Sequence, residues 1–472
     1  MVGIHSWGLY VPFWRLDLGC VRKGLKGERA VANFDEDSLT MGVAAGINCL
    51  KGIDRGSVDG LFFASTTFPY KEKQASVLAA TALDLPTNNF LTADFGNSLR
   101  SGTTALLAAF NAVAAGTAKQ ILVIASDMRI PMSGSDLEQE IGDGAAAFLI
   151  SSADSGVMIR DSYSIADEIL DIWRTDEDKF VRSWEERFNL DQGYFRVLPK
   201  AVSGLMQKNN ITGKDLSKAV FYGPNKRRHA EMGKRLGLTP EQVEPSLFGL
   251  IGDTGAASTL MMLASALEKA EPGDRILTAS YGNGSDSLLI EVEGDIDQRP
   301  QSSMQAYVTS KGVLQDYVRY LHWRGLIDRV TGRRRPPIPS PSASCIWRET
   351  DQNIRFYAAR CRKCDTIQYP PNRICFNCHT KDEMDAHRLS DKEAELNTFT
   401  EDYATPNPDP PLALGVVDFD GGGRTSLYIT DKGDKKLAIG MRVEMTFRKL
   451  FTTEGIHNYT WKCEPLRFSE EK

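Results

Sequence analysis

The sequence lacks the features that would place it in a membrane, on nucleic acid or in the secretory pathway. No apolar run in its 472 residues approaches the ~20 that are needed to span a bilayer. The first residues, MVGIHSWGLYVPFWRL, have no basic start, long apolar core or small-residue cleavage site of a signal peptide. The net charge of −6 argues against a nucleic-acid binder, which normally carries a strongly basic face. We therefore expect a cytoplasmic protein that binds neither nucleic acid nor membranes.

Cysteine is nearly absent from the first 340 residues, where only Cys20 and Cys49 occur. Four of the other six cysteines form two Cys-x2-Cys pairs that are separated by ten residues: Cys361, Cys364, Cys375 and Cys378. This spacing is typical of a metal site rather than a disulfide framework. Two such pairs complete a tetrahedral shell of four thiolates, which leaves no open position on the metal, so we expect a structural zinc. His379 is an alternative ligand, but an all-thiolate shell is the simpler choice.

Residues 1–295 alternate short β-type runs with Ala-rich stretches, a pattern that favours a layered α/β fold. The predicted strands include LFFAS, QILVIAS, AAFLIS, AVFYG, RILTAS and SLLIEVE. Residues 102–126 resemble residues 255–280, because each segment is a small-residue turn, an apolar helix and a strand that ends in Ala-Ser. The repeat predicts a duplicated fold with two related halves. Coincidence between two ordinary helix–strand units is the alternative.

After residue 295 the composition and the pattern of apolar residues change. Residues 302–332 predict one or two amphipathic helices, and a Pro-, Ser- and Arg-rich stretch with Arg333, Arg334 and Arg335 predicts a solvated linker. From residue 393 onward, short β-type runs separated by Gly/Asp turns predict a small barrel. We thus expect four regions: an α/β domain at 1–295, a helical connector and linker at 296–344, a zinc ribbon at 345–390 and a barrel at 391–472.

The motifs of residues 1–295 resemble the 3-hydroxy-3-methylglutaryl-CoA synthase branch of the thiolase superfamily. The matching stretches are VGIHSWGLYVP, DEDSLTMGVAAG, SLRSGTTAL, DIWRTDED, VFYGPN, IGDTGAAS and ILTASYGNGSD. Residues 300–472 resemble the zinc-ribbon and OB-fold proteins that accompany thiolase-like enzymes. The resemblance implies a five-layer thiolase-like domain, an acyl-CoA substrate whose coenzyme A is part of the substrate, and a homodimer.

The sequence departs from this family at the positions that carry its chemistry. Leu99 stands where condensing members have a cysteine nucleophile, and Tyr222 replaces the histidine of the Pro-Asn turn. Asp253 replaces the asparagine of a Gly-Asn-Thr turn, and Thr66 replaces the glutamate of a Thr-Glu-Thr turn. Leucine cannot carry an acyl group, and no histidine aligns near Ser98 or Ser101 to activate either hydroxyl. Covalent thiolase or synthase chemistry is therefore not expected.

Two main hypotheses remain. The chain resembles thiolase-like aldolases that lack the cysteine and rely on tyrosine, which implies retro-aldol cleavage of a 3-hydroxyacyl-CoA, or its reverse, with Tyr222 and Asp253 as the catalytic pair. The alternative is a catalytically silent acyl-CoA-binding scaffold, in which Tyr222 is a packed aromatic and Asp253 a helix N-cap. A synthase- or thiolase-like acyltransferase is a third possibility.

Other residues are weaker candidates for binding substrate or coenzyme A. They are Asn225 in the Pro-Asn turn, Lys226 beside it as a phosphate contact, Asn283 in a Gly-rich turn, and Ser101. Aromatic residues between 160 and 198 either line the pocket or pack at the surface: Trp173, Phe180, Trp184, Phe188, Tyr194 and Phe195.

Overall fold

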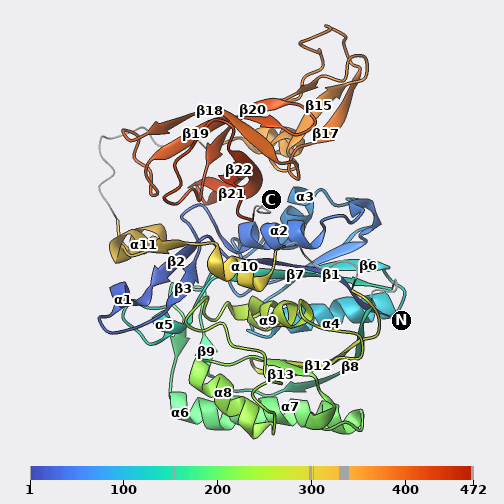
Figure 1. The fold of residues 1–472 in the computed structure, drawn as a ribbon, viewed down its shortest axis with the longest axis vertical. Helices are drawn as coiled ribbons and strands as arrows, with labels where there is room; N and C mark the ends of the chain where they lie inside the picture. Colours follow the sequence, from blue (N-terminus) through green and yellow to red (C-terminus); the bar gives the residue numbers. More distant parts are fainter. Residues whose placement is uncertain (1, 153–155, 297–299, 301, 329–339, 469–472) are drawn as a thin grey trace. The chain divides into compact units, whose positions relative to one another are not determined.

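The computed structural model (Figure 1) describes residues 2–152, 156–296, 300, 302–328 and 340–468. Arg333, Arg334 and Arg335 of the predicted linker lie outside the described residues. The chain divides into two compact units. The first comprises Met1–Ala32, Asp37–Ala80 and Leu85–Gln315, and the second comprises Asn33–Glu36, Thr81–Asp84 and Asp316–Lys472.

The first unit is built on a nine-stranded sheet with the order β11-β12-β13-β8-β1-β7-β6-β4-β5. Its strands are β1 (Gly3–Tyr10), β4 (Gly60–Ala64), β5 (Leu91–Phe95), β6 (Gln120–Asp127), β7 (Gly144–Ser151), β8 (Val157–Ala166), β11 (Lys218–Phe221), β12 (Arg275–Tyr281) and β13 (Gly284–Val292). The six runs that the sequence predicted as strands are confirmed. All eight residues of β7 are buried, as expected for a strand that is covered on both faces.

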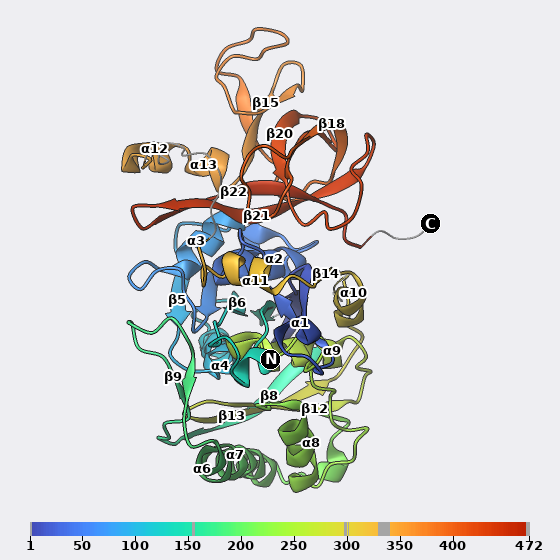
Figure 2. The same cartoon turned by 90° about the vertical axis from the view of Figure 1, so that its left-hand side faces the viewer.

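The sheet consists of two halves that meet between β1 and β8, where the described pairing is between Gly3 and Met158. Helix α4 (Ser101–Ala114) precedes β6 in one half, and α9 (Ser258–Leu267) precedes β12 in the other. The two helices lie between the halves, with α2 (Ser38–Cys49) outside the first half (Figures 1 and 2). Outside the second half lie α7 (Phe195–Lys208) and α8 (Lys226–Arg235). The predicted duplicated, five-layer α/β fold is confirmed.

The sequence of the two central helices explains their position. Every residue of α9 is buried, which agrees with a helix that is apolar on all sides. Gly102 lets the first turn of α4 approach the backbone of the short helix η4 (Gly255–Ala257), because a Cβ atom there would overlap the carbonyl oxygen of Ala256. The starts of α4 and of the second repeat's helix are therefore held close together.

Shorter elements complete the first unit. The strands are β2 (Trp14–Asp17), β3 (Glu28–Val31), β9 (Ile172–Trp173), β10 (Arg182–Ser183) and β14 (Gly312–Leu314). The helices are α1 (Leu18–Val21), η1 (Arg55–Ser57), α3 (Ala75–Ala82), α5 (Leu137–Glu140), α6 (Glu186–Phe188), η2 (Asn189–Tyr194), η3 (Gly213–Asp215) and α10 (Met304–Thr309).

The second unit contains a small three-stranded sheet and a closed five-stranded barrel. The sheet has β15 (Tyr357–Cys361), β16 (Ile367–Gln368) and β17 (Met384–Arg388); the barrel has β18 (Ala394–Asp402), β19 (Leu412–Phe419), β20 (Arg424–Ile429), β21 (Arg442–Thr453) and β22 (Ile456–Pro465). Its helices are α11 (Tyr317–Trp323), α12 (Ala343–Arg348) and α13 (Thr350–Asn353). The ring of Phe356 stacks on Trp461 with 5.9 Å between centroids, so aromatic packing joins the first residues of the ribbon to the barrel. The predicted barrel is confirmed.

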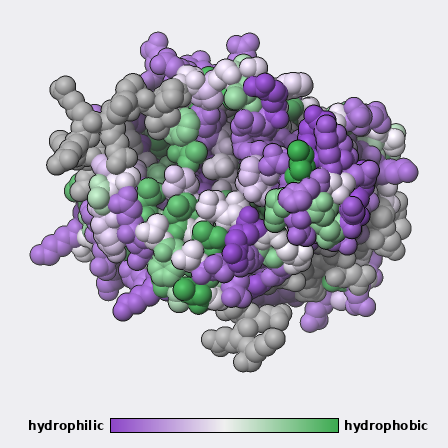
Figure 3. All heavy atoms as spheres, turned by 90° about the horizontal axis from the view of Figure 1, so that it is seen from above, coloured by the Kyte–Doolittle hydropathy of each residue, from purple (hydrophilic) through white to green (hydrophobic). Residues whose placement is uncertain are grey.

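The molecular surface in Figure 3 carries hydrophobic side chains interspersed among hydrophilic ones. Such mixing is usual for a face in contact with water. Among the described helices, none combines the length and the apolar character that crossing a bilayer requires.

Candidate functional site

A cavity of about 1030 Å³ opens in the first unit. Its wall is formed by residues 66, 97–99, 129, 132, 135–137, 139, 140, 169–174, 181–184, 186, 189, 190, 194, 222, 224, 225 and 281–283. Chain segments that are far apart in the sequence meet here because they follow strand ends or precede helices of both halves of the sheet. Leu99, Tyr222, Asn225 and Asn283, which the sequence marked as candidates, all lie on this wall.

Leu99 occupies the turn before α4, where its half-buried side chain packs against the core of the second half. The turn is fastened to the Gly-rich loop after β12, because the Ser98 hydroxyl donates to the carbonyl of Gly282 at 2.8 Å. None of the described residues on the cavity wall is a cysteine. In the first unit, the Cys49 thiol is buried, and burial raises its pKa to about 12. The wall therefore presents a hydrocarbon side chain at this turn and no ionised thiol.

Tyr222 and Asp253 are brought together, as the sequence predicted. The Tyr222 hydroxyl donates to Oδ2 of Asp253 at 3.3 Å, and Arg129 Nη2 donates to the same oxygen at 2.5 Å. The other carboxylate oxygen, Oδ1, accepts from the backbone N–H of Gly255 at 2.9 Å. All three side chains are almost fully buried, at 2%, 4% and 2% exposure for Tyr222, Asp253 and Arg129. No sequence motif pointed to Arg129, which follows β6 and lies 124 positions from Asp253.

Burial dominates the protonation of this group. Burial and the neighbouring Asp253 carboxylate raise the pKa of Tyr222 well above its ordinary value, so its hydroxyl keeps its proton. Burial would lower the pKa of Arg129, but the Asp253 carboxylate outweighs that effect and raises it, so Arg129 stays charged. Two of its nitrogens, Nε and Nη1, make no hydrogen bond to any described residue. The site therefore offers a neutral hydroxyl and a buried cation with unused N–H groups.

Thr66 stands where the related synthases carry a glutamate, and its polar groups form hydrogen bonds within the protein. Its backbone N–H and its hydroxyl donate to the two oxygens of Asp127 at 2.7 and 3.0 Å. The Asp127 carboxylate also accepts from Ser65 and from the backbone of Ala256. Asp127 thus ties the ends of β4 and β6 to the start of the second repeat's helix.

Glu140 is a carboxylate on the wall that the sequence analysis missed. It is the last residue of α5, a four-residue helix that no sequence motif predicts. Its backbone carbonyl accepts from the N–H of Asp253 at 2.6 Å. Burial, and then the charges of Asp253 and Asp136, raise the pKa of the Glu140 carboxyl to about 7.

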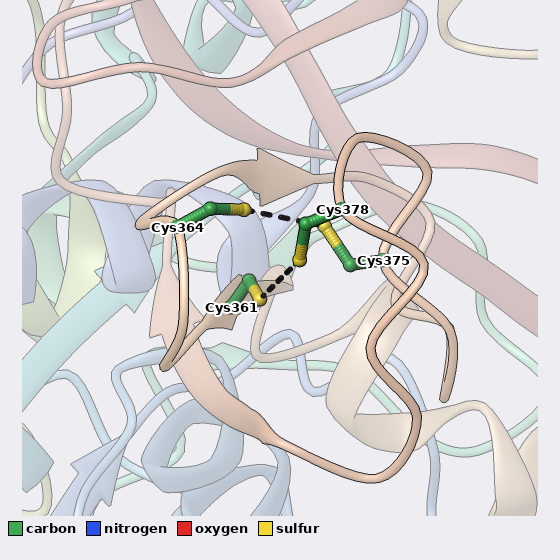
Figure 4. A group of neighbouring side chains, drawn as sticks. All are labelled: Cys361, Cys364, Cys375 and Cys378. Atoms are coloured by element: carbon green, nitrogen blue, oxygen red, sulfur yellow. Dashed lines mark hydrogen bonds between the residues drawn. The ribbon is translucent and has the colours of Figure 1, made fainter.

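The second unit holds the four-cysteine group (Figure 4), in which all four Sγ atoms lie within 4.8 Å of one another. Sγ of Cys361 is 3.6 Å from that of Cys378, and the same distance separates Cys364 from Cys375. A tetrahedral zinc with Zn–S bonds of about 2.3 Å requires sulfurs about 3.8 Å apart, so the donor set fits this metal.

The two cysteine pairs are built as copies of one turn. Asp365 and His379 each follow the second cysteine of a pair and adopt φ values of 57° and 58°. Each also donates its backbone N–H back to the first cysteine of the pair. His379 therefore has the same place in its turn as Asp365, and the predicted group of ligands consists of cysteines alone.

About two thirds of the chain aligns with known proteins of one family. It is 33% identical over 341 residues to the hydroxymethylglutaryl-CoA synthase of Aeropyrum pernix, an alignment that covers 68% of this chain and 94% of the relative. It is 34% identical over 335 residues to the synthase of Pyrococcus horikoshii, with 68% and 95% covered. The chain belongs to the hydroxymethylglutaryl-CoA synthase family.

Family models match further parts of this hydroxymethylglutaryl-CoA synthase family member. Residues 206–291 match the C-terminal part of 3-oxoacyl-[acyl-carrier-protein] synthase III. Residues 352–384 match the rubredoxin-like zinc ribbon domain of ChsH2, and residues 386–448 match its C-terminal OB-fold domain. The four cysteines lie inside the matched ribbon, so the predicted zinc ribbon and OB-fold are confirmed.

Solved structures agree on the fold. An HMG-CoA synthase complexed with CoA is similar with a TM-score of 0.60 at 18% identity, covering 66% of this chain and 88% of that one. The 3-oxoacyl-[acyl-carrier-protein] synthase III of Aquifex aeolicus gives a TM-score of 0.56 at 20% identity, with 62% and 100% covered. The first unit is therefore a thiolase-like domain of an acyl-CoA-utilising family.

The candidate substrate- and CoA-binding residues of this synthase-family chain do not all lie on the cavity wall. Asn225 caps α8, with its Oδ1 accepting from the N–H of Arg228 at 2.9 Å, and Asn283 adopts a φ of 48° in the Gly-rich loop. Lys226 is exposed on α8 and is not among the residues that line the cavity. Ser101 is buried behind the wall, and its hydroxyl has no hydrogen-bond partner among the described residues.

Some aromatic residues between 160 and 198 line the cavity, and others do not. Trp173, Trp184 and Tyr194 line the cavity. Phe188 is 56% exposed, and Phe195 packs in the core under α8 with Arg235 over its ring. Aromatic residues of the stretch from β9 to η2 therefore form part of the cavity wall.

Proposed function

We propose that this family member cleaves the C2–C3 bond of a 3-hydroxyacyl-CoA by a retro-aldol reaction, or forms it in reverse, without a covalent acyl-enzyme. The observation that carries the proposal is that Tyr222 and Arg129 lie on the wall of a cavity where Leu99 stands in place of a thiol, and that both are held by the buried Asp253 carboxylate behind them. The group provides donors and a fixed negative charge but no nucleophile for a thioester.

The chemistry follows from these groups. A base removes the proton of the C3 hydroxyl, the C2–C3 bond breaks as C3 becomes a carbonyl, and the bonding electrons move into a thioester enolate. Protonation of C2 then gives a shorter acyl-CoA. The neutral Tyr222 hydroxyl and the unused N–H groups of Arg129 would stabilise the enolate oxygen, since preorganised donors act strongly in a buried site.

The cavity supports a thioester substrate of some size. At about 1030 Å³ it exceeds the volume of ordinary small-molecule pockets, and Trp173, Trp184 and Tyr194 give it apolar surface for an acyl chain. Asn225 and Asn283 on the wall, with exposed Lys226 nearby in sequence, are our candidates for contacts to coenzyme A. Ser101 stays a prediction.

The second unit would have a structural role. We propose that the four cysteines bind one zinc ion, whose closed shell holds a ribbon with little hydrophobic core. The fourfold division at 295, 344 and 390 and a homodimer through the thiolase-like domain also remain our proposals.

The function is tested by incubating the purified full-length protein with a panel of 3-hydroxyacyl-CoAs of increasing chain size. We expect release of an aldehyde or ketone together with the shortened acyl-CoA, measured by mass spectrometry. Binding of acyl-CoA without release from any substrate would favour a silent scaffold, which the N-cap contact from Gly255 to Asp253 also accommodates. Labelling of a cysteine by a haloacetyl-CoA would instead favour a synthase- or thiolase-like acyltransferase.

A further inference from the structure

Glu140 is fixed beside the Tyr222–Asp253–Arg129 group by its own backbone. Asp253 N–H donates to the Glu140 carbonyl at 2.6 Å, and Gly142 N–H donates to the Asp253 carbonyl at 3.0 Å. Ile141 and Asp253 form a parallel β-bridge between these two bonds. The segment that carries Glu140 therefore runs alongside the segment that carries Asp253, and Glu140 itself borders the cavity.

The retro-aldol reaction needs a base, and the two catalytic residues predicted from the sequence are poorly suited to that part. Both carboxylate oxygens of Asp253 are occupied, one by Arg129 and Tyr222 and the other by Gly255 N–H. Neither oxygen is therefore free to approach a substrate hydroxyl. Tyr222 holds its proton too tightly, because burial and Asp253 raise its pKa.

His229 does not supply the missing base either. It is buried, it stacks on Phe221 with 4.6 Å between ring centroids, and it is not among the residues of the cavity wall. Burial lowers its pKa to about 4, so it is neutral and enclosed at neutral pH.

Glu140 differs from these groups in three respects. Its side chain is half-buried and borders the cavity. Among the described residues, none donates a hydrogen bond to its carboxyl. Burial and the like charges of Asp253 and Asp136 raise its pKa. These conditions favour proton exchange near neutral pH, where a general base works best.

We infer that Glu140 is the general base of this site, and that Tyr222 and Arg129 serve as donors while Asp253 positions them. The inference rests on the proposed function. The Glu140 carboxylate takes the proton of the C3 hydroxyl, the C2–C3 electron pair passes into the enolate, and the Glu140 carboxylic acid returns a proton to C2. Atoms and charges balance, and no further reactant is required.

Other charged and titratable groups face the same cavity. The Asp253 and Asp136 carboxylates act on Glu140, and the wall also carries Tyr222 and the charged residues Arg129, Asp171, Arg174, Arg182 and Glu186. Because several groups can titrate here, the rate of a variant alone is not decisive. The pH profile of each variant is needed as well.

The test compares Glu140→Gln and Glu140→Asp with the full-length protein on the 3-hydroxyacyl-CoA that it cleaves best. Glu140→Gln keeps the shape of the side chain and the backbone bonds, so the protein should fold. We expect kcat/KM to fall by about 100- to 10,000-fold. In the native protein, kcat/KM should rise with pH through about 7 as Glu140 loses its proton, and Glu140→Gln should lack this rise. Glu140→Asp should recover part of the rate and retain a rise.

Glu138→Gln is the matched control, because Glu138 lies on the same short helix but is not among the wall residues. It should keep the native pH profile. Native rates and an unchanged rise with pH in Glu140→Gln would overturn the inference while leaving the proposed function intact. A native protein that cleaves no 3-hydroxyacyl-CoA would overturn both.

Discussion

Replacing Tyr222 with phenylalanine is expected to lower kcat/KM by about 100- to 1,000-fold, which is the usual effect of removing one preorganised donor from a developing oxyanion. The substitution removes only the hydroxyl that lies 3.3 Å from Asp253. The ring keeps its neighbours, Tyr194 at 6.2 Å and Tyr281 at 6.3 Å between centroids. Steady-state kinetics with a cleaved 3-hydroxyacyl-CoA, together with thermal unfolding, measure the effect.

A control separates this loss from a general effect of removing a hydroxyl. Tyr163 is 37% exposed on β8 and is not on the cavity wall, so Tyr163→Phe should keep the native rate. Since the Tyr222 ring stays packed, Tyr222→Phe should unfold within a few degrees of the native protein. A native rate in Tyr222→Phe would rule out a role for its hydroxyl in the reaction.

Replacing Cys375 with serine is expected to release the zinc and unfold the ribbon. Cys375 is fully buried, and its Sγ lies 3.6 Å from that of Cys364. Zinc binding supplies about 10–16 kcal/mol to small zinc-finger folds at neutral pH, and three ligands cannot retain most of that free energy. Metal content by atomic spectroscopy should fall from one zinc per chain to none. Protease cleavage should appear between residues 352 and 384.

Cys345→Ser provides the comparison for this experiment. Cys345 lies on α12 and does not belong to the four-cysteine group, so its loss should leave both zinc and protease resistance unchanged. One full equivalent of zinc in the Cys375→Ser protein would show that the four thiolates are not the ligands.

Most of the fold could be predicted from the sequence, because the patterns that indicate it are local and occur more than once. The helix–strand repeat at 102–126 and 255–280 predicted α4–β6 and α9–β12, and the cysteine spacing predicted the group that forms in the ribbon. Tyr222 and Asp253 stand at motif positions that follow a strand or turn of the family fold. They could therefore be named together from the sequence, and they are hydrogen-bonded in the structure.

The partners of those residues could not be predicted in the same way. Arg129 and Glu140 belong to the irregular stretch between β6 and β7, where neither periodicity nor a motif fixes the backbone. Their roles depend on burial and on contacts with Asp253, more than 100 positions along the chain. Only the folded chain shows that Asp253 is already paired and that Glu140 has the freer carboxyl.

The mass of the intact protein during turnover tests the central claim most directly, which is that this site acts on an acyl-CoA without forming a bond to it. Protein quenched while it consumes a 3-hydroxyacyl-CoA should keep its unmodified mass, while the shortened acyl-CoA and the carbonyl product accumulate in equal amounts. An increase in protein mass that equals the acyl group, located on a cysteine of the first unit, would contradict the account.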